Sequence, residues 1–331
     1  MISIWKRVFA GNLCFILFMA ITIQNVYCSE KFTGDFLSLG AGARALGMGS
    51  TFVAVTDGAV STYYNPAGLS RLNVNEINFM HSEQFGGLEN YNTISAAAPL
   101  SESVYAGLSL IHVGVGNIPY TRLWDPSKAL SDSNRVEVVS HEDAADYALY
   151  LSGAKRFTEK LSIGTSFKII RRSIGPDTAF GFGIDVGLQY RINRRWDMGI
   201  AFKDITGTTI AWDVQSNDRD HTTNDRIAAT MDAGLAYKDI APWIGGNYIL
   251  TASMIFFGDS PDVKGLDTMN IGLEYIMVDL LAFRAGMSGG NGTFGVGLMR
   301  LPLISSSSLD YAFLGHEELD STHRISLTVR F

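Results

Sequence analysis

The chain has 331 residues, of which 47% are hydrophobic and 11% aromatic, and its formal net charge is -7. The acidic balance, and the lack of a basic cluster with interleaved aromatic residues, argue against nucleic-acid binding. Both cysteines, Cys14 and Cys28, lie near the N-terminus, so the rest of the chain can form no disulfide and offers no cysteine metal ligand.

The first 28 residues have the three parts of a secretory signal peptide. Lys6 and Arg7 supply the positive end, residues 13–23 form the apolar stretch, and Val26-Tyr27-Cys28 is a small-x-small cleavage sequence. The apolar stretch is short for a membrane-spanning helix, and no stop-transfer pattern follows it. We therefore predict a signal peptide over residues 1–28. Lipid attachment at Cys28 is the alternative, which the bulky residue before it disfavours.

Residues 29–72 are rich in small residues and form a segment of their own. We expect the carboxylate of Asp57 to cap a short helix over residues 58–63, because it can accept hydrogen bonds from the free amides of a first turn. Asn65 precedes Pro66 and is therefore pushed out of the helical region, so the chain must turn there. These features predict a compact hatch, or plug, that is too short to be a separate domain.

Polar and apolar residues alternate from residue 73 to the C-terminus. In the last ten residues, Ile325, Leu327, Val329 and Phe331 alternate with Arg324, Ser326, Thr328 and Arg330. Side chains alternate faces along a strand, so this segment has one apolar and one polar face. The pattern predicts about fourteen strands, near residues 75–83, 90–98, 103–114, 145–157, 161–172, 180–191, 195–204, 226–238, 248–257, 268–277, 280–288, 293–300, 307–314 and 322–331.

The charged residues fall almost entirely on the polar face of these strands. In the eighth strand, for example, Asp232 lies on the polar face, whereas Ile227 and Met231 lie on the apolar face, which we expect to point outwards. A charge facing lipid costs roughly 2–4 kcal/mol at mid-membrane, so this segregation favours a lipid-exposed barrel. Tight turns at residues 99–102, 158–160 and 193–194 alternate with long connections at 115–144 and 205–225, as in outer-membrane barrels. We predict an all-β fold, a transmembrane antiparallel β-barrel of about fourteen strands over residues 73–331. A soluble β-sandwich or lipocalin-like barrel is the alternative.

Charges of both signs are predicted to face the lumen of this barrel. They either pair across strands and anchor the hatch, which we prefer, or line an aqueous path and tune its selectivity. A plugged barrel of about fourteen strands would leave no open pore, so unrestricted porin activity is not expected. The residues concerned are Lys168, Arg172, Asp185, Lys203, Asp232, Glu274, Arg284, Asp310, Arg324 and Arg330.

No catalytic, cofactor or metal site is predicted. The histidines of the barrel are scattered over strand ends and loops without metal-ligand spacing, and His141-Glu142-Asp143 lacks a helical His-Glu-x-x-His frame. Gly40-x-Gly42-x-x-Ala45 matches a loose dinucleotide fingerprint, but no parallel sheet with crossover helices follows it. We therefore expect a protein that is not an enzyme.

The run from Gly42 to Ser70, GARALGMGSTFVAVTDGAVSTYYNPAGLS, resembles the N-terminal signature of the PorV/PorQ family. That family is related to the FadL-type outer-membrane transporters of hydrophobic compounds, and the resemblance extends over nearly the whole mature chain. It implies a fourteen-stranded barrel with an N-terminal hatch in a bacterial outer membrane. By the same resemblance, Arg44, Asp57, Asn65 and Pro66 position the hatch, and the final aromatic residue, Phe331, is recognised by the outer-membrane assembly machinery.

Two functions are open at this point, and we prefer the first. In the first, a small hydrophobic molecule enters near Tyr120 and Trp124, and the hatch shifts to release it into the periplasm or sideways into the lipid. A clamp touching lipid headgroups is the alternative role for these two aromatic residues. In the second, the chain is a scaffold or shuttle of a type IX-like secretion system, and secretion-system proteins bind the long loops.

Overall fold

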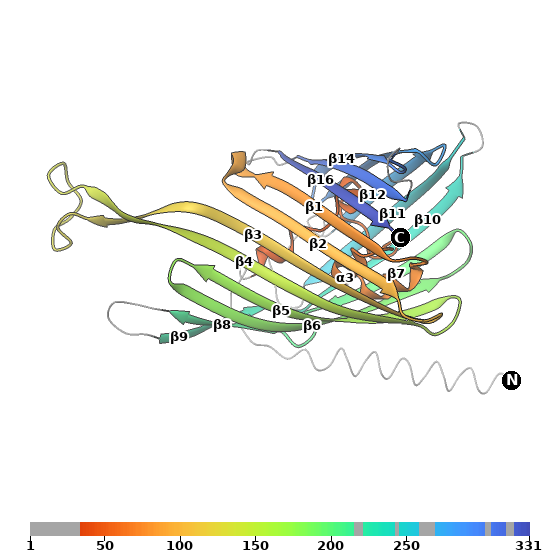
Figure 1. Ribbon diagram of the computed structural model, residues 1–331, viewed down its shortest axis with the longest axis horizontal. Helices are drawn as coiled ribbons and strands as arrows, with labels where there is room; N and C mark the ends of the chain where they lie inside the picture. The colour runs from red at the N-terminus through yellow and green to blue at the C-terminus, as the bar shows by residue number, and fades with distance from the viewer. Residues whose placement is uncertain (1–33, 215–220, 242–244, 258–268, 302–305, 316–320) are drawn as a thin grey trace.

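The computed structural model describes residues 34–214, 221–241, 245–257, 269–301, 306–315 and 321–331 (Figure 1). The predicted signal peptide and the lipid-attachment alternative at Cys28 lie outside these residues. Within the described ranges, no helix is long and apolar enough to cross a membrane.

Antiparallel strands form one sheet that closes on itself, because β5 pairs with β6 as well as with β4. The closed wall has fourteen strands, which confirms the predicted fold class. They are β1 (Glu76–Gln84), β2 (Glu89–Pro99), β3 (Val104–Leu123), β4 (Val136–Arg156), β5 (Leu161–Ile174), β6 (Asp177–Arg191), β7 (Trp196–Lys203), β10 (Thr230–Ile240), β11 (Asn247–Phe257), β12 (Met269–Met277), β13 (Leu281–Ser288), β14 (Asn291–Leu298), β15 (Ser307–Leu314) and β16 (Thr322–Arg330).

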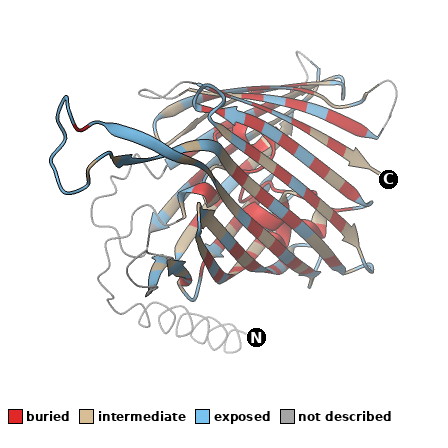
Figure 2. Ribbon diagram, turned by 60° about the vertical axis from the view of Figure 1, so that its left-hand side comes forward, coloured by how far each residue is buried: buried red, intermediate tan, exposed pale blue. Residues whose placement is uncertain are grey.

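Polar and apolar residues alternate along the strands because successive side chains point to the lumen and to the outside of the barrel in turn. In β16, Arg324 and Ser326 face the lumen and are buried, whereas Ile325 between them is 53% exposed on the outside. Figure 2 shows the same change between buried and exposed residues along the other strands. One row of apolar side chains runs across four neighbouring strands, β15, β16, β1 and β2. It consists, in that order, of Leu309, Leu327, Phe79 and Ile94. Such an apolar outer band is stabilised by hydrocarbon.

The hatch consists of short helices and turns enclosed by the barrel (Figure 1). Its elements are η1 (Asp35–Leu37), α2 (Ala43–Gly47), α3 (Ser61–Tyr64) and η2 (Pro66–Arg71), and a further short helix, η3 (Phe85–Gly87), connects β1 with β2. Leu46, Met48 and Phe52 of the hatch are almost completely buried and belong to one apolar cluster. The helices are too short to be stable alone, so packing against the wall must hold them.

The two long connections predicted as loops are largely strands, and that prediction was wrong. β3 and β4 continue to Leu123 and Val136 as a ribbon that projects from one end of the barrel (Figure 1). Between residues 205 and 225, β8 (Thr208–Val214) and the start of β9 (His221–Ile227) form a hairpin that extends β7 and β10 outwards. Irregular pairing within the ribbon disturbs the alternation, which hid these strands in the sequence.

One face assignment was also wrong. Ile227 was placed on the outward face of the eighth predicted strand, but it packs against the buried apolar cluster of the hatch. Residues 228 and 229, between β9 and β10, are outside both strands, so the phase of the alternation changes there. A shift of one residue turns every following side chain to the other face.

Candidate functional site

The hatch backbone lies directly against glycines of the barrel wall. A Cβ atom added at Gly199 would lie 2.1 Å from the carbonyl oxygen of Val53, and one added at Gly164 would lie 2.4 Å from the carbonyl carbon of Pro66. The hatch backbone also comes close to Gly272, Gly286 and Gly295, whereas hatch side chains come close to Gly187 and Gly234. Glycine on the inward face therefore makes room for the hatch.

Asn65 links the hatch to the wall by hydrogen bonds of its side chain. Its backbone is extended (φ -163°, ψ 104°), as expected before a proline, and Pro66 begins η2. The side-chain amide donates to the carbonyl oxygen of Val53 at 3.0 Å and to that of Leu188 in β6 at 3.1 Å. The Oδ1 atom accepts from the amide of Ala67, so both ends of this short side chain are held.

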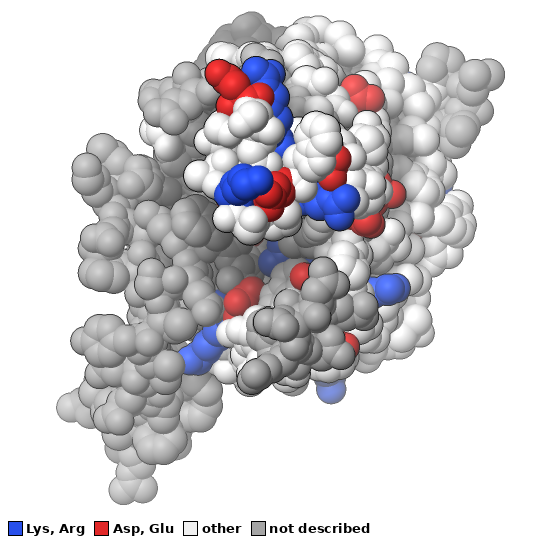
Figure 3. All heavy atoms as spheres, turned by 90° about the vertical axis from the view of Figure 1, so that its left-hand side faces the viewer, with Lys and Arg blue, Asp and Glu red and all other residues white. Residues whose placement is uncertain are grey.

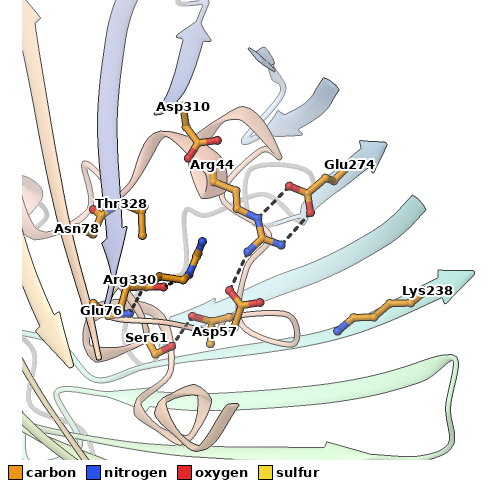
Figure 4. Close-up of polar contacts among 12 residues, drawn as sticks. Arg44, Asp57, Ser61, Glu76, Asn78, Lys238, Glu274, Asp310, Thr328 and Arg330 are labelled. Atoms are coloured by element: carbon orange, nitrogen blue, oxygen red, sulfur yellow. Dashed lines mark hydrogen bonds and ion pairs between the residues drawn. The ribbon is translucent and has the colours of Figure 1, made fainter. Parts of the chain in front are cut away.

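Arg44 joins the hatch to another part of the wall, at β12 (Figure 4). Its Nε and Nη2 atoms donate to the two carboxylate oxygens of Glu274 in β12 at 2.9 and 2.8 Å, and Nη1 donates to Asp57 at 2.7 Å. Burial alone lowers the pKa of Arg44, but the carboxylates of Asp57 and Glu274 outweigh it and raise that pKa well above its usual value. The guanidinium therefore stays charged.

Asp57 does not have its predicted role as a helix cap. α3 begins at Ser61, its N-cap is Val60, and no side chain caps it. The carboxylate of Asp57 binds Arg44 instead of the backbone amides of a helix. A hydrogen bond to a charged guanidinium is stronger than one to a neutral amide.

Further lumen charges pair across strands of the wall. Glu274 also accepts from Arg284 of β13 at 2.8 Å, and Arg284 in turn pairs with Asp310 of β15 at 2.8 Å. Near the C-terminus, Arg330 pairs with Glu76 of β1 at 2.8 Å. These contacts suit the structural interpretation of the lumen charges, in which ion pairs connect strands and hold the hatch.

A second cluster of buried charged side chains lies at the connection between β7 and β8, which contains Asp204. Lys168 lies 2.9 Å from Asp185 and 2.6 Å from Asp204, and all three are buried. Asp204 has a positive φ of 53°, which few residues other than glycine adopt. Asp232 is less well satisfied, since one of its buried carboxylate oxygens has no hydrogen-bond partner.

Several apolar side chains face the lumen towards the projecting ribbon, and Phe36 of the hatch belongs to the same cluster. Phe36 belongs to the same buried apolar cluster as Ile111, Val113, Ile170 and Ile210 of the strands, against which Trp212 packs; we call these wall residues, together with Arg172, the outer chamber. The guanidinium of Arg172 lies 5.4 Å from the ring centre of Phe36 and 5.5 Å from that of Trp212. Asp146 holds this guanidinium with hydrogen bonds of 2.9 and 3.0 Å. The chamber can therefore enclose an aromatic or aliphatic group.

At the opposite end of the hatch, a cavity of about 40 Å³ lies between α2 and the strands β15, β16 and β1. Its lining includes Arg44, Asp57, Glu76, Asn78 and Arg330, several of which are drawn in Figure 4. The side chains of Asp57 and Arg330 are 44% and 38% exposed, so this cavity borders solvent on the side of the C-terminus. It has room for water and is polar enough to bind it.

The predicted access residues do not line the outer chamber. Trp124 is 76% exposed at the end of β3 in the ribbon, and Tyr120 is 39% exposed with its hydroxyl beside Gly175. Figure 3 looks onto this end of the molecule, where basic and acidic side chains lie side by side. Arg122, for example, donates to Glu137 at 2.8 Å. The contact of Phe36 with this chamber was missed, and its only sequence signal was apolar residues at inward positions, such as Ile170.

Within the described ranges, no group of three or more His, Cys, Asp or Glu side chains could hold a metal ion.

No family model and no curated protein matches the sequence, the PorV/PorQ family included. Solved structures do match. The P. putida toluene transporter TodX is 14% identical, with a TM-score of 0.62 over 88% of this chain and 99% of that one. The CymD monoaromatic hydrocarbon channel is 14% identical, with a TM-score of 0.56 over 88% of this chain and 98% of its own. A Pseudomonas aeruginosa FadL homologue is 11% identical, with a TM-score of 0.55 over the same shares. The chain therefore has the fold of FadL-type outer-membrane barrels.

Proposed function

We propose that this protein is a bacterial outer-membrane channel for small hydrophobic compounds, and that it binds them in the outer chamber. The observation that carries the proposal is Phe36, a buried hatch side chain that belongs to one apolar cluster with residues of the wall and lies against Arg172 of β5. Similar folds in a toluene transporter and a monoaromatic hydrocarbon channel support it, although low identity limits that support to the fold.

In this proposal, a hydrophobic solute takes the place of Phe36. Burying a phenylalanine side chain is worth roughly 1.5–3 kcal/mol, and a solute of similar apolar area would recover that free energy. η1 has only three residues and is too short to be stable by itself, so its position depends on the packing of Phe36, which a solute would replace. The polar cavity beside Arg44 and Arg330 supports release towards the periplasm rather than sideways into lipid.

Truncation of Phe36 tests the proposal. In the wild type, toluene must displace the ring of Phe36 before it can bind. Phe36→Ala removes that ring and leaves an apolar space, so the Kd for toluene is expected to fall about tenfold. The measurement is calorimetric titration of the detergent-solubilised full chain with toluene. Phe85→Ala is the matched control, because Phe85 lies in η3 and is 40% exposed. Equal toluene binding by the two variants and the wild type would contradict the proposal.

The second candidate function is a scaffold or shuttle in a type IX-like secretion system, as the PorV/PorQ resemblance implies. The projecting ribbon favours it, since Trp124, Leu130 and Val138 are 76%, 68% and 55% exposed there. Exposed apolar side chains of this kind are typical of protein contacts. Deletion of residues 117–142 separates the two functions: loss of protein export with unchanged toluene binding would support the scaffold, and unchanged export would exclude this ribbon as its docking site.

A further inference from the structure

Basic side chains gather on two neighbouring short turns of the barrel, at the end opposite the projecting ribbon (Figure 1). The turns are residues 157–160, between β4 and β5, and residues 192–195, between β6 and β7. They lie side by side because β5 pairs with β6, and the backbone amide of Arg191 donates to the carbonyl oxygen of Lys160 at 2.8 Å. We call these turns and the strand ends beside them the basic rim, whose exposed cations are Lys155, Lys160, Arg191, Arg194 and Arg195.

The basic rim has more cations than its own carboxylates can neutralise. Residues 155–160 and 191–196 hold six basic residues and one acidic residue, Glu159, in a chain whose net charge is -7. Among the residues that the structure describes, no carboxylate forms an ion pair with Lys160 or Arg194. The positive surplus is therefore local to this rim and lies on exposed side chains.

Asp197, at the start of β7, does not remove this surplus. Three cations share its carboxylate at 2.9–3.7 Å, one of them from the hatch; they are Lys238, Arg71 and Arg191. One carboxylate balances one positive charge, so Asp197 leaves two of these three without compensation. Arg195, by contrast, pairs with Asp239 at 3.3 Å.

Two other turns at the same end of the barrel are acidic. Residues 100–103 connect β2 with β3, and residues 278–280 connect β12 with β13. Each turn holds a single charged residue, Glu102 in the first and Asp279 in the second. The basic surplus thus belongs to the side formed by β4 to β7, and is not a general property of short turns in this barrel.

Outward aromatic side chains place the basic rim at the edge of the membrane. Phe157, Tyr190 and Trp196 are exposed on the outer face, and the Trp196 ring lies 5.0 Å from that of Tyr237 in β10. Aromatic residues of outer-membrane barrels gather where hydrocarbon gives way to headgroups. The Nζ atom of Lys155 lies 5.3 Å from the ring centre of Phe157, so at least this cation lies at the level of the aromatic side chains.

We propose that the basic rim binds the phosphate headgroup of an anionic phospholipid in the periplasmic leaflet. Short turns of such barrels lie on the periplasmic side, and cations next to a membrane surface attract lipids with a net negative charge. Lysine and arginine are also the side chains that bind phosphate oxygens by charge-assisted hydrogen bonds. An acidic protein fits less well, because the cations adjoin side chains that face lipid.

Phosphatidylglycerol and phosphatidylethanolamine with identical acyl chains are matched probes, since only the first has a net negative charge at pH 7. The full chain in detergent is mixed with equal amounts of both lipids, and the bound lipids are counted by native mass spectrometry. The wild type is expected to retain phosphatidylglycerol at least about fivefold in preference. Replacing both Lys160→Gln and Arg194→Gln is expected to reduce this preference below about twofold.

Lys128→Gln together with Arg135→Gln is the matched control, because it removes two exposed cations from the projecting ribbon at the other end. The control is expected to keep the full preference. Lys155→Gln serves as the second variant if the first fails to fold, and it is expected to weaken the preference in part.

Equal retention of the two lipids by the wild type would overturn the proposal in favour of an acidic protein partner. An unchanged preference in the rim variants, or an equal loss in the ribbon control, would overturn the assigned site. The proposal rests on the outer-membrane location alone, so retention of neither lipid would contradict that location, whereas the toluene titration tests the channel function separately.

Discussion

Replacing Glu274 by Gln is expected to lower the free energy of unfolding by about 3 kcal/mol. Two guanidinium groups share this buried carboxylate, with Arg44 at 2.8 Å and Arg284 at 2.8 Å. Glutamine keeps the size and one acceptor but removes the charge, so Asp57 and Asp310 alone must balance both cations. Removal of one partner from a buried pair is strongly destabilising because the remaining charge cannot reach water.

The measurement is urea unfolding of the refolded barrel, followed by tryptophan fluorescence. Glu137→Gln is the matched control, since Glu137 makes the same type of contact with Arg122 at 2.8 Å but both side chains are exposed, at 45% and 63%. Exposed pairs contribute about 0–1 kcal/mol, so this control is expected to change little. If the two variants unfold at the same urea concentration, the Glu274 cluster is not what fastens the hatch to β12 and β13.

Gly199→Val is expected to leave the barrel closed on itself but to prevent docking of the hatch. The added Cβ atom would lie 2.1 Å from the carbonyl oxygen of Val53, which is backbone and cannot turn aside. The outward face of β7 is unchanged, so insertion into the membrane should persist. A barrel of about fourteen strands without its plug should conduct ions, because larger barrels already contain aqueous channels.

Conductance in planar lipid bilayers checks this expectation, together with cleavage of the hatch by added protease. Gly292→Val in β14 is the control, because nothing lies within 4 Å of a Cβ atom built at that glycine. The control should stay closed and resist the protease. A Gly199→Val protein that also stays closed, with a protected hatch, would show that the wall glycines are not required for docking.

The sequence by itself determined the barrel. Side-chain alternation is a local property with a period of two, and a lipid-facing wall requires it in every strand, so Ile325 and Arg324 could be assigned to opposite faces from their spacing alone. The tight turns and the bend at Asn65-Pro66 were equally local, because backbone restrictions before proline act between neighbouring residues. Where the pairing is interrupted, as at residues 228 and 229 directly after Ile227, this local reasoning failed.

Only the tertiary structure decided what the inward residues do. Residues far apart in the chain meet inside the lumen, such as Arg44 with Glu274 and Asn65 with Leu188, and no period in the sequence encodes those distances. A glycine on the inward face was visible in the sequence, but its reason, the nearby hatch backbone, was not. The same holds for Arg324, which is one more polar-face arginine in the sequence and a buried cation without an ion-pair partner among the residues that the structure describes.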